Sequence, residues 1–278
     1  MGADPGMQMY AEALVVRENC RSTLESVQLL EPGEGDLIVD SLFSGVSSGT
    51  EKLLFEGRMP FFPGLSYPLV PGYESVGRVA AGPRERIGEL VFVPGTRGFR
   101  DFACLFGATA SRLVVPADRA VTIPEELGVD GTMLALAATA HNAIALGGAP
   151  ELIIGHGVLG RICARLTLAL GFPSPTVWEN NPARRGGVSE YRITGREDDN
   201  RRDYPRIIDV SGDPSILDQA IAHLARDGEI TLAGFYSEPL GFSFPPAFMR
   251  RARIRIAAEF SRNDIESVLG LLAAGRLS

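Results

Sequence analysis

The sequence is poor in the side chains that build disulfide frameworks and metal centres. It holds three cysteines, Cys20, Cys104 and Cys163, and three histidines in 278 residues. The cysteines are odd in number, widely spaced and form no Cys-x-x-Cys pair. This pattern excludes a disulfide framework and fits a reducing, cytoplasmic environment.

Long apolar runs and excess positive charge are missing too. The most apolar stretch, 133–146, is interrupted by His141 and Asn142, so no transmembrane helix is predicted. No basic region followed by an apolar block stands at the N-terminus, so no secretory signal is expected. The formal net charge is −7 and no basic stripe occurs, which excludes nucleic acid as a partner.

What the chain does have is a glycine-rich turn, Gly155-x-Gly157-x-x-Gly160, between a short apolar run, 152–154, and a helical stretch, 161–170. The first glycine permits a tight turn, the second lets the backbone approach a pyrophosphate, and the third lets the helix pack on its strand. The helix N-terminus then offers free N–H groups to phosphates. We expect these residues to line the pyrophosphate: Gly155, His156, Gly157, Val158, Leu159 and Gly160.

A second apolar run, 176–178, ends in Glu179, nineteen residues after Gly160. A carboxylate at this place accepts hydrogen bonds from the adenosine ribose and repels a 2′-phosphate, which favours NAD as the cofactor. Arg184 and Arg185 are a counter-signal for NADP, although they come late in the loop. The alternative to a bound dinucleotide is a glycine turn in an ordinary β–α unit.

The pattern of apolar residues along the chain changes near residue 124. Before it, short alternating runs separated by Gly and Pro clusters predict a small barrel-like domain over 1–124. After it, a helical segment, 125–147, leads into alternating strands and helices, which predict an α/β Rossmann domain with a doubly wound parallel sheet over 125–278. The predicted strands of the two domains are 11–17, 37–43, 75–80, 89–93 and 111–115, then 152–154, 176–178, 191–193, 206–210, 229–233 and 253–257.

Helices are predicted over 215–225 and 264–274, the second close to the last residue, with no segment after it predicted to return to the first domain. The charged stretch 195–203 is predicted to be a solvated loop. His223 is predicted to lie on the surface of its helix.

Three segments, 70–77, 107–119 and 137–143, resemble landmarks of the medium-chain dehydrogenase/reductase superfamily. The resemblance implies a GroES-like β-barrel domain before the Rossmann domain, and a helix around 137–143 that passes the nicotinamide. On that basis Thr139, together with Asp209, Ser211 and Gly234 near strand ends, is expected to line the rest of the cofactor.

A closer resemblance is carried by 44–51, 55–77 and 155–161. These segments are similar to a family of dehydrogenases in bacteriochlorophyll synthesis that oxidise a 1-hydroxyethyl side chain to acetyl with NAD. The resemblance implies a small-molecule tetrapyrrole substrate. Two rival functions remain open: a zinc-independent NADPH quinone or enoyl reductase of the same fold, and a non-catalytic dinucleotide-binding protein.

The superfamily's zinc ligands have no counterpart in this chain. The corresponding positions carry Ser47 or Ser48, Tyr73 and Ala135, whereas Zn²⁺ prefers thiolate, imidazole or carboxylate. We therefore expect no metal. The alternative is an unusual zinc site built from Glu51, Glu74 and a histidine.

Without zinc, hydroxyl groups must orient the substrate and move its proton. Tyr73 stands where a ligand histidine would be, and its phenol can donate and accept a hydrogen bond. Thr50 lies near the family's proton-relay hydroxyl, and Glu51 and Glu74 are candidates to orient Tyr73. The predicted catalytic residues are Tyr73, Thr50, Ser47, Ser48 and Glu74. For Tyr73, the alternative is a core tyrosine with a satisfied hydroxyl.

An apolar, proline-stiffened loop beside this segment is the candidate substrate surface. Phe61, Phe62 and Tyr67 suit the flat face of a macrocycle, and Arg58 suits a propionate carboxylate. The alternative is that these side chains pack the barrel core or a subunit contact. The sequence leaves the oligomeric state open, with a homodimer as the candidate assembly.

Overall fold

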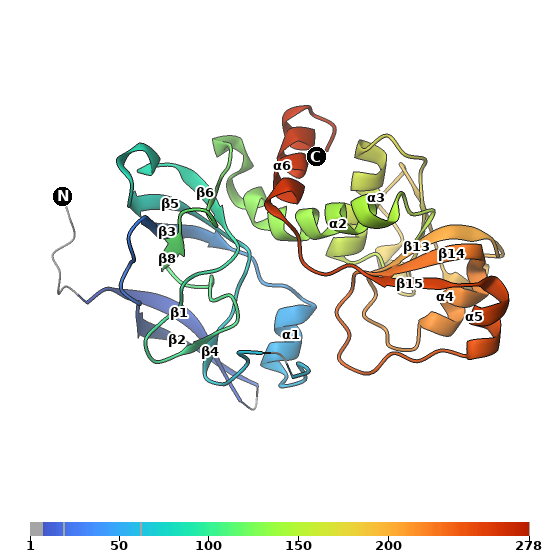
Figure 1. The fold of residues 1–278 in the computed structure, drawn as a ribbon, viewed down its shortest axis with the longest axis horizontal. Coiled ribbons are helices and arrows are strands. Elements are labelled where there is room, and N and C mark those ends of the chain that lie inside the picture. Colours follow the sequence, from blue (N-terminus) through green and yellow to red (C-terminus); the bar gives the residue numbers. More distant parts are fainter. Residues whose placement is uncertain (1–7, 19, 62, 278) are drawn as a thin grey trace. The chain divides into compact units, whose positions relative to one another are not determined.

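The computed structural model describes residues 8–18, 20–61 and 63–277. The chain forms two compact units, and the first consists of two β-sheets around a shared apolar core (Figure 1). The strands pair in the orders β2-β1-β4-β7 and β8-β3-β5-β6-β9. Their bounds are β1 (Tyr10–Arg17), β2 (Arg21–Gln28), β3 (Asp36–Ser44), β4 (Leu69–Val70), β5 (Ser75–Ala81), β6 (Leu90–Val93), β7 (Ala103–Cys104), β8 (Arg112–Pro116) and β9 (Val121–Thr122).

Alternation of side chains explains how these strands bury one face. On β1, Ala11, Ala13 and Val15 are buried, whereas the intervening Glu12 is exposed. A period of two places successive side chains on opposite faces of a sheet, so one face of β1 supplies core residues. The predicted N-terminal β domain is confirmed.

Two short helical segments complete the first unit. Helix α1 (Thr50–Phe55) follows β3, and the 3₁₀ segment η2 (Glu125–Met133) contacts β3, β5 and β6. Gly131 and Thr132 of η2 are buried. The units therefore divide between Ala135 and Leu136 rather than at the predicted 124/125.

The second unit is built on a six-stranded parallel sheet in the order β12-β11-β10-β13-β14-β15. In chain order its strands run 3-2-1-4-5-6, which is the doubly wound Rossmann order. The predicted Rossmann domain is confirmed. Its strands are β10 (Leu152–Ile154), β11 (Thr176–Trp178), β12 (Arg192–Thr194), β13 (Tyr204–Asp209), β14 (Leu224–Leu232) and β15 (Arg253–Ile256).

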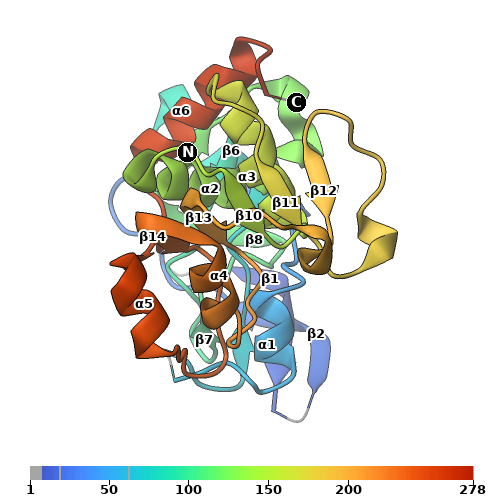
Figure 2. The ribbon, with the colours of Figure 1, turned by 90° about the vertical axis from the view of Figure 1, so that its right-hand side faces the viewer.

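Helices cover both faces of this sheet, with α3 and α6 on one side and α4 and α5 on the other (Figures 1 and 2). Side chains of α4 and α5 join Leu152 and Ile154 of β10 in one apolar cluster. The helices are α2 (Leu134–Gly147), α3 (Val158–Ala169), α4 (Leu217–His223), α5 (Phe244–Arg250) and α6 (Arg262–Ala273). No helix among the described residues is both long and apolar enough to cross a membrane.

The prediction that His223 lies on the surface is wrong, and the mostly exposed loop predicted over 195–203 contains a buried acid. His223 is buried, with its ring 4.6 Å from the ring of Trp178 in an edge-on contact. Within the charged stretch 195–203, Asp199 is also buried, and it accepts hydrogen bonds from Trp178 Nε1 (2.7 Å) and the Tyr204 hydroxyl (2.9 Å). A buried indole N–H needs an acceptor, and this acid supplies it.

Candidate functional site

The glycine loop joins β10 to α3 beside the point where the strand order reverses, between β10 and β13. Gly155 has φ +103°, and a Cβ there would lie 3.2 Å from the nitrogen of Ser211. A Cβ on Gly160 would lie 1.9 Å from the carbonyl oxygen of Gly155, which is too close for any side chain. By contrast, a Cβ on Gly157 would meet no atom within 4 Å. The loop is therefore tightly packed at Gly155 and Gly160 and open at Gly157.

The open glycine is the N-cap of α3, and no side chain caps this helix. Gly157 and Val158 are exposed, and Leu159 is half-buried. The first N–H groups of a helix lack partners within the helix and carry its positive dipole end. This terminus therefore has the chemistry that binds a phosphate.

Glu179 and His156 tie the glycine loop to the loop after β11. Glu179 is buried, and its carboxylate accepts hydrogen bonds from the nitrogens of His156 (3.3 Å) and Asn181 (2.7 Å). His156 is also buried; its Nδ1 lies 2.8 Å from the carbonyl oxygen of Arg184, and its Nε2 lies 2.9 Å from the Tyr191 hydroxyl. Because a carbonyl only accepts, Nδ1 carries the proton and Nε2 accepts from the phenol.

Burial lowers the pKa of His156 below its usual range, partly offset by the Arg184 carbonyl. Its imidazole is therefore neutral at pH 7 and occupied on both nitrogens. The side chain holds two loops together, while its backbone remains part of the loop predicted to bind pyrophosphate.

The two arginines that could favour a 2′-phosphate differ in environment. The Arg185 guanidinium donates to the carbonyl oxygens of Glu179 (2.6 Å) and Asn180 (3.3 Å) and pairs with Glu197 (3.2 Å). Arg184 is exposed. The structure therefore commits Arg185 to the loop itself.

Other predicted cofactor residues gather at the carboxyl ends of β13 and β14. Asp209 is fully buried and accepts from the nitrogen of Ser211 (3.0 Å) and from the Tyr236 hydroxyl. The nitrogen of Gly234 donates to the Asp209 carbonyl (3.1 Å). Burial raises the pKa of Asp209 above its usual range. Thr139 lies half-buried on α2.

In the first unit, three of the predicted catalytic hydroxyl groups come together. The side chains of Ser47 and Thr50 lie near the Tyr73 hydroxyl and partly offset the rise of its pKa. Ser47 Oγ in turn accepts from the nitrogens of Gly49 (3.2 Å) and Thr50 (3.3 Å) at the start of α1. Ser48 is exposed. Burial raises the pKa of Tyr73 to about 12, so its phenol is protonated at pH 7.

Two carboxyl groups accompany this hydroxyl cluster. Glu51, in the first turn of α1, and Glu74, just before β5, are both buried. Burial raises the pKa of Glu74 to about 7, and repulsion from Glu51 adds to the rise. Burial also raises the pKa of Glu51, against the hydrogen bond from the Ser47 nitrogen.

The structure divides the predicted substrate loop into buried and exposed parts. Tyr67 packs against a small apolar cluster, and its hydroxyl donates to the carbonyl of Leu54 at 2.5 Å. Phe61 is 92% exposed. Arg58 is exposed and pairs with Glu56 at 3.2 Å. Phe62 lies outside the described residues.

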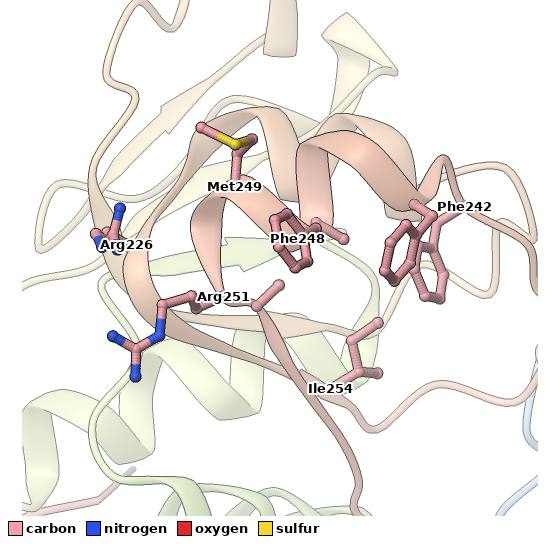
Figure 3. A pocket seen from close by; sticks show the side chains of 9 residues that line it. Arg226, Phe242, Phe248, Met249, Arg251 and Ile254 are labelled. Carbon is pink, nitrogen blue, oxygen red and sulfur yellow. The ribbon is translucent and has the colours of Figure 1, made fainter.

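Two pockets lie away from the glycine loop. An apolar one, lined by side chains of α5 and β15 that include Phe248, Met249 and Ile254, lies at a sheet edge three strands from β10 (Figure 3). A smaller pocket of about 250 Å³ in the first unit is lined by Ser47 and Glu51, among others. Sites for larger organic ligands span roughly 300–1,000 Å³. The smaller pocket alone therefore cannot enclose a macrocycle.

Across the described part of the chain, no three His, Cys, Asp or Glu side chains gather in a way that could hold a metal ion. The alternative zinc site of Glu51, Glu74 and a histidine is therefore not assembled. A zinc-free chemistry stays a prediction.

Comparisons with known proteins decide the family. The chain is 49% identical over 265 residues to the 2-desacetyl-2-hydroxyethyl bacteriochlorophyllide A dehydrogenase of Cereibacter sphaeroides, covering 92% of this chain and 83% of that protein. It is 48% identical over 256 residues to the protein of the same name in Rhodobacter capsulatus, covering 90% and 82%. The chain belongs to the hydroxyethyl bacteriochlorophyllide dehydrogenase family. No protein-family model matches it.

Solved structures place this dehydrogenase in the medium-chain dehydrogenase/reductase fold. Acetophenone reductase from Geotrichum candidum, in complex with NAD, superimposes with a TM-score of 0.82 at 18% identity, covering 97% of this chain and 88% of the reductase. Structures of the same fold hold NADP or NADH. The predicted two-domain dehydrogenase fold is confirmed.

Two tyrosines that shape the sites of this dehydrogenase could not be found from the sequence. Tyr191 holds His156 across 35 residues of sequence, and Tyr236 holds Asp209 across 27. Neither tyrosine belongs to a local motif. The signal that could have found them is the need of each buried polar partner for a second hydrogen bond.

Proposed function

We propose that this chain oxidises the hydroxyethyl side chain of a bacteriochlorophyllide to an acetyl group, with NAD as cofactor, in bacteriochlorophyll synthesis. The observation that carries the proposal is the identity of 49% and 48% to two dehydrogenases named for that substrate, over about nine tenths of this chain. The packed glycine loop supports it, because a dehydrogenase needs a built dinucleotide site.

A bound nicotinamide supplies the chemistry of accepting the hydride from the alcohol carbon. The chain's own residues bind and orient. The N-terminus of α3 at Gly157 would hold the pyrophosphate, and Glu179 would meet the adenosine ribose. Asp209, Ser211, Gly234 and Thr139 would line the rest of the cofactor.

NAD rather than NADP is supported by the state of two side chains. Glu179 is buried and fixed by two backbone N–H groups, so its carboxylate cannot swing away from a 2′-phosphate. Arg185 already binds the carbonyls of Glu179 and Asn180. To make room for or to bind a 2′-phosphate, Glu179 or Arg185 would have to give up one of these hydrogen bonds. Leaving a buried polar group unpaired costs on the order of 1–3 kcal/mol.

Tyr73 and its hydroxyl partners would orient the substrate oxygen in place of zinc. Because the phenol is protonated at pH 7, it acts first as a hydrogen-bond donor. Ser47 and Thr50 lie near it, and Ser48 is exposed on the same segment. Replacing Tyr73 by Phe is expected to lower kcat by about 10². An unchanged kcat would clear Tyr73 of any part in proton transfer.

The pigment itself would contact the exposed part of the loop after α1. Phe61 offers an apolar face, and Arg58 offers a guanidinium for a propionate. Phe62 is proposed to join them. Tyr67 would hold the loop in place through the hydrogen bond from its hydroxyl to the Leu54 carbonyl.

A homodimer is part of the proposal, supported by the apolar surface around β15. This strand is one outer edge of the sheet, and Phe248, Met249 and Ile256 are each more than 60% exposed. Figure 3 shows Phe248 and Met249 beside this strand. An open edge beside apolar side chains is a surface that a partner strand can cover. Light scattering of the purified chain would test it; a monomer at all concentrations would contradict it. A reducing, cytoplasmic location stays a prediction, supported by the free thiols of Cys20, Cys104 and Cys163.

The function is tested by incubating the chain with a hydroxyethyl pigment and either NAD or NADP. The acetyl product shifts the pigment's absorption, and we expect it with NAD at a rate well above that with NADP. The same pigment with a vinyl group is the matched control, because it has no alcohol to oxidise. Coenzyme binding without pigment turnover would favour the non-catalytic alternative, and a preference for NADPH with quinones or enoyl substrates would favour the reductase.

A further inference from the structure

The two carboxyl groups beside Tyr73 are buried and incompletely hydrogen-bonded. Glu51 is 7% exposed and Glu74 is 4% exposed. One oxygen of Glu51 accepts from the Ser47 nitrogen at 2.5 Å, but Oε1 of each glutamate has no hydrogen-bond partner among the described residues. Burying an unpaired carboxylate is costly, and a protein group in that position takes up a proton instead.

The packing around Gly45 fixes where the Glu74 carboxyl lies. A Cβ on Gly45 would fall 2.3 Å from Oε2 of Glu74 and 2.9 Å from its Cβ. The nitrogen of Gly45 also donates to the Glu74 carbonyl at 2.8 Å. Glu74 is therefore pressed against the segment that leads to Ser47 and Glu51, and it cannot turn out to solvent without losing this contact.

The charges that act on the pair are negative. Among the described residues, the charge that acts on Glu74 is that of Glu51, and both glutamates act on Tyr73. Lys52, the next residue on α1, is directed to the surface, where it pairs with Glu56. Two carboxylates that repel each other cannot both ionise readily, so the pair holds a proton near neutral pH.

The Tyr73 hydroxyl lies close enough to both carboxyl groups for their charges to raise its pKa, and it is not itself a base. Its phenol is protonated at pH 7, and the side chains of Ser47 and Thr50 lie near it. A protonated hydroxyl can accept one proton while it donates another, which makes it a relay rather than a store. The store must be a group that is partly ionised at the working pH, and Glu74 meets that condition.

We propose that Glu74 and Glu51 form a coupled carboxyl pair that receives the proton of the oxidised alcohol through the Tyr73 hydroxyl. This inference rests on the proposed dehydrogenase function. Oxidation removes a hydride with two electrons from the alcohol carbon and a proton from its oxygen, and the C–O bond becomes double. The hydride passes to oxidised NAD, and the proton passes by way of Tyr73 to the Glu74 carboxylate. Glu74 later releases it to water.

The first test follows the carboxyl proton in the coenzyme-free protein by infrared difference spectroscopy between pH 5 and pH 9. We expect a protonated-carboxyl band that disappears with a midpoint of about 7 and is absent from Glu74→Gln. Glu51→Gln removes the repelling charge and should lower the midpoint by about one pH unit. Glu56→Gln, a change at the half-buried C-cap of the same helix, is the control and should leave it in place. A midpoint that ignores Glu51→Gln would overturn the proposal.

Thermal unfolding gives a second readout that needs no substrate. Because burial raises the pKa of Glu74 above its unfolded value of 4.5, the folded protein binds more protons between these values. Stability is therefore lost as the pH rises through about 7. Glu74→Gln should raise the melting temperature at pH 9, by at least about 3 °C, relative to its effect at pH 5. An equal effect at both pH values would contradict a titrating Glu74.

The pH profile of pigment oxidation tests the role in catalysis. We expect kcat to fall on the acid side with a midpoint of about 7, where Glu74 is already protonated. Glu74→Gln should lower kcat by about 10² and remove this limb, whereas Glu74→Asp should restore part of the rate. Glu51→Gln should move the limb to lower pH. An unshifted limb in Glu51→Gln would sink the relay. Failure of the wild-type chain to oxidise the pigment would leave the infrared titration intact, so it would contradict the proposed function alone.

Discussion

The glycine-loop region and the Tyr73 region treat their buried polar groups in opposite ways. Around the glycine loop, both oxygens of Glu179 accept backbone N–H groups, and both nitrogens of His156 are hydrogen-bonded. Beside Tyr73, Glu51 and Glu74 each keep an oxygen without a partner. The buried side chains at the glycine loop thus have all these polar atoms hydrogen-bonded, whereas those beside Tyr73 do not.

This difference matches what each region would have to do. A binding loop works best when its shape is fixed before the ligand arrives, because preorganisation removes an entropic cost of binding. A proton-transfer site needs a group whose ionised and protonated forms are close in free energy. Saturation serves the first demand, and incomplete pairing serves the second.

The largest expected effect comes from filling the packed glycine. Gly160→Ala places a Cβ 1.9 Å from the Gly155 carbonyl, so we expect loss of measurable NAD binding and a lower melting temperature. Gly157→Ala is the matched control, because its Cβ meets no atom in the protein. It should change stability by no more than about 0.5 kcal/mol yet weaken NAD binding. Calorimetry and a binding titration distinguish the two. If Gly157→Ala bound NAD as wild type does, the open glycine would not be a phosphate site.

A smaller effect is expected from neutralising Glu179, whose two carboxylate oxygens both accept hydrogen bonds. Glu179→Gln replaces an acceptor oxygen by an amide, so one of its two backbone contacts is lost, and it removes the charge that repels a 2′-phosphate. We expect the preference for NAD over NADP to fall about tenfold, equivalent to ~1.4 kcal/mol. Glu197→Gln, which touches the same loop through exposed Arg185 contacts, should leave the preference unchanged. Equal preference in wild type and Glu179→Gln would remove Glu179 from coenzyme selection.

Breaking the hydrogen bond to His156 should cost less. Tyr191→Phe leaves Nε2 of the buried imidazole unpaired, which we expect to lower stability by about 1 kcal/mol. Tyr10→Phe, an exposed tyrosine bonded to Gln8, is the control and should be neutral. Chemical denaturation measures both. If the two variants were equally stable, the glycine loop would not depend on this bond.

The same imidazole predicts a pH dependence of opposite sign to that of Glu74. Because burial lowers the pKa of His156 from 6.5, the unfolded chain takes up its proton first. The stability that it contributes is present above pH 6.5 and is lost as the pH falls through the lower folded value. His156→Gln should flatten the acid side of the stability curve, measured by denaturation from pH 5 to pH 8. A slope unchanged in the variant would contradict a buried neutral His156.

The smallest effect concerns the exposed substrate surface. Arg58→Ala removes an exposed guanidinium that is bonded only to Glu56 among the described contacts, so stability should hardly change. We expect KM for the pigment to rise about threefold with kcat unchanged, because the interaction is the same in the ground and transition states. Arg17→Ala, in a comparable surface pair with Glu25, is the control. An unchanged KM would indicate that this loop does not meet the pigment.

Much of the fold could be predicted because local pattern and tertiary packing agree. β10 and β11 have the predicted bounds, 152–154 and 176–178, since each is a short apolar run bounded by turn residues. Strand β2 was missed because it is an edge strand with mostly exposed side chains and no alternating pattern. Helix α5 was expected from the alternation of strands and helices, but its bounds were not, because its first turn contains two prolines, which the N-terminus of a helix tolerates.

The candidate sites also differ in how far the sequence predicts them. The glycine loop can be predicted because only glycine fits the backbone space at 155 and 160. The raised pKa of Glu74 is not written there, since it depends on burial and on the approach of Glu51 from a segment 23 residues away. The burial of His223 could not be predicted either, because it depends on contact with Trp178 of β11, which is distant in sequence.

A time course at neutral pH, with pigment and coenzyme followed in the same sample, tests whether the chain couples the two reactions. We expect one reduced nicotinamide for each acetyl group formed, and both signals should slow together in Glu74→Gln. Bound coenzyme with neither signal changing, or reduced nicotinamide without acetyl pigment, would contradict this coupling.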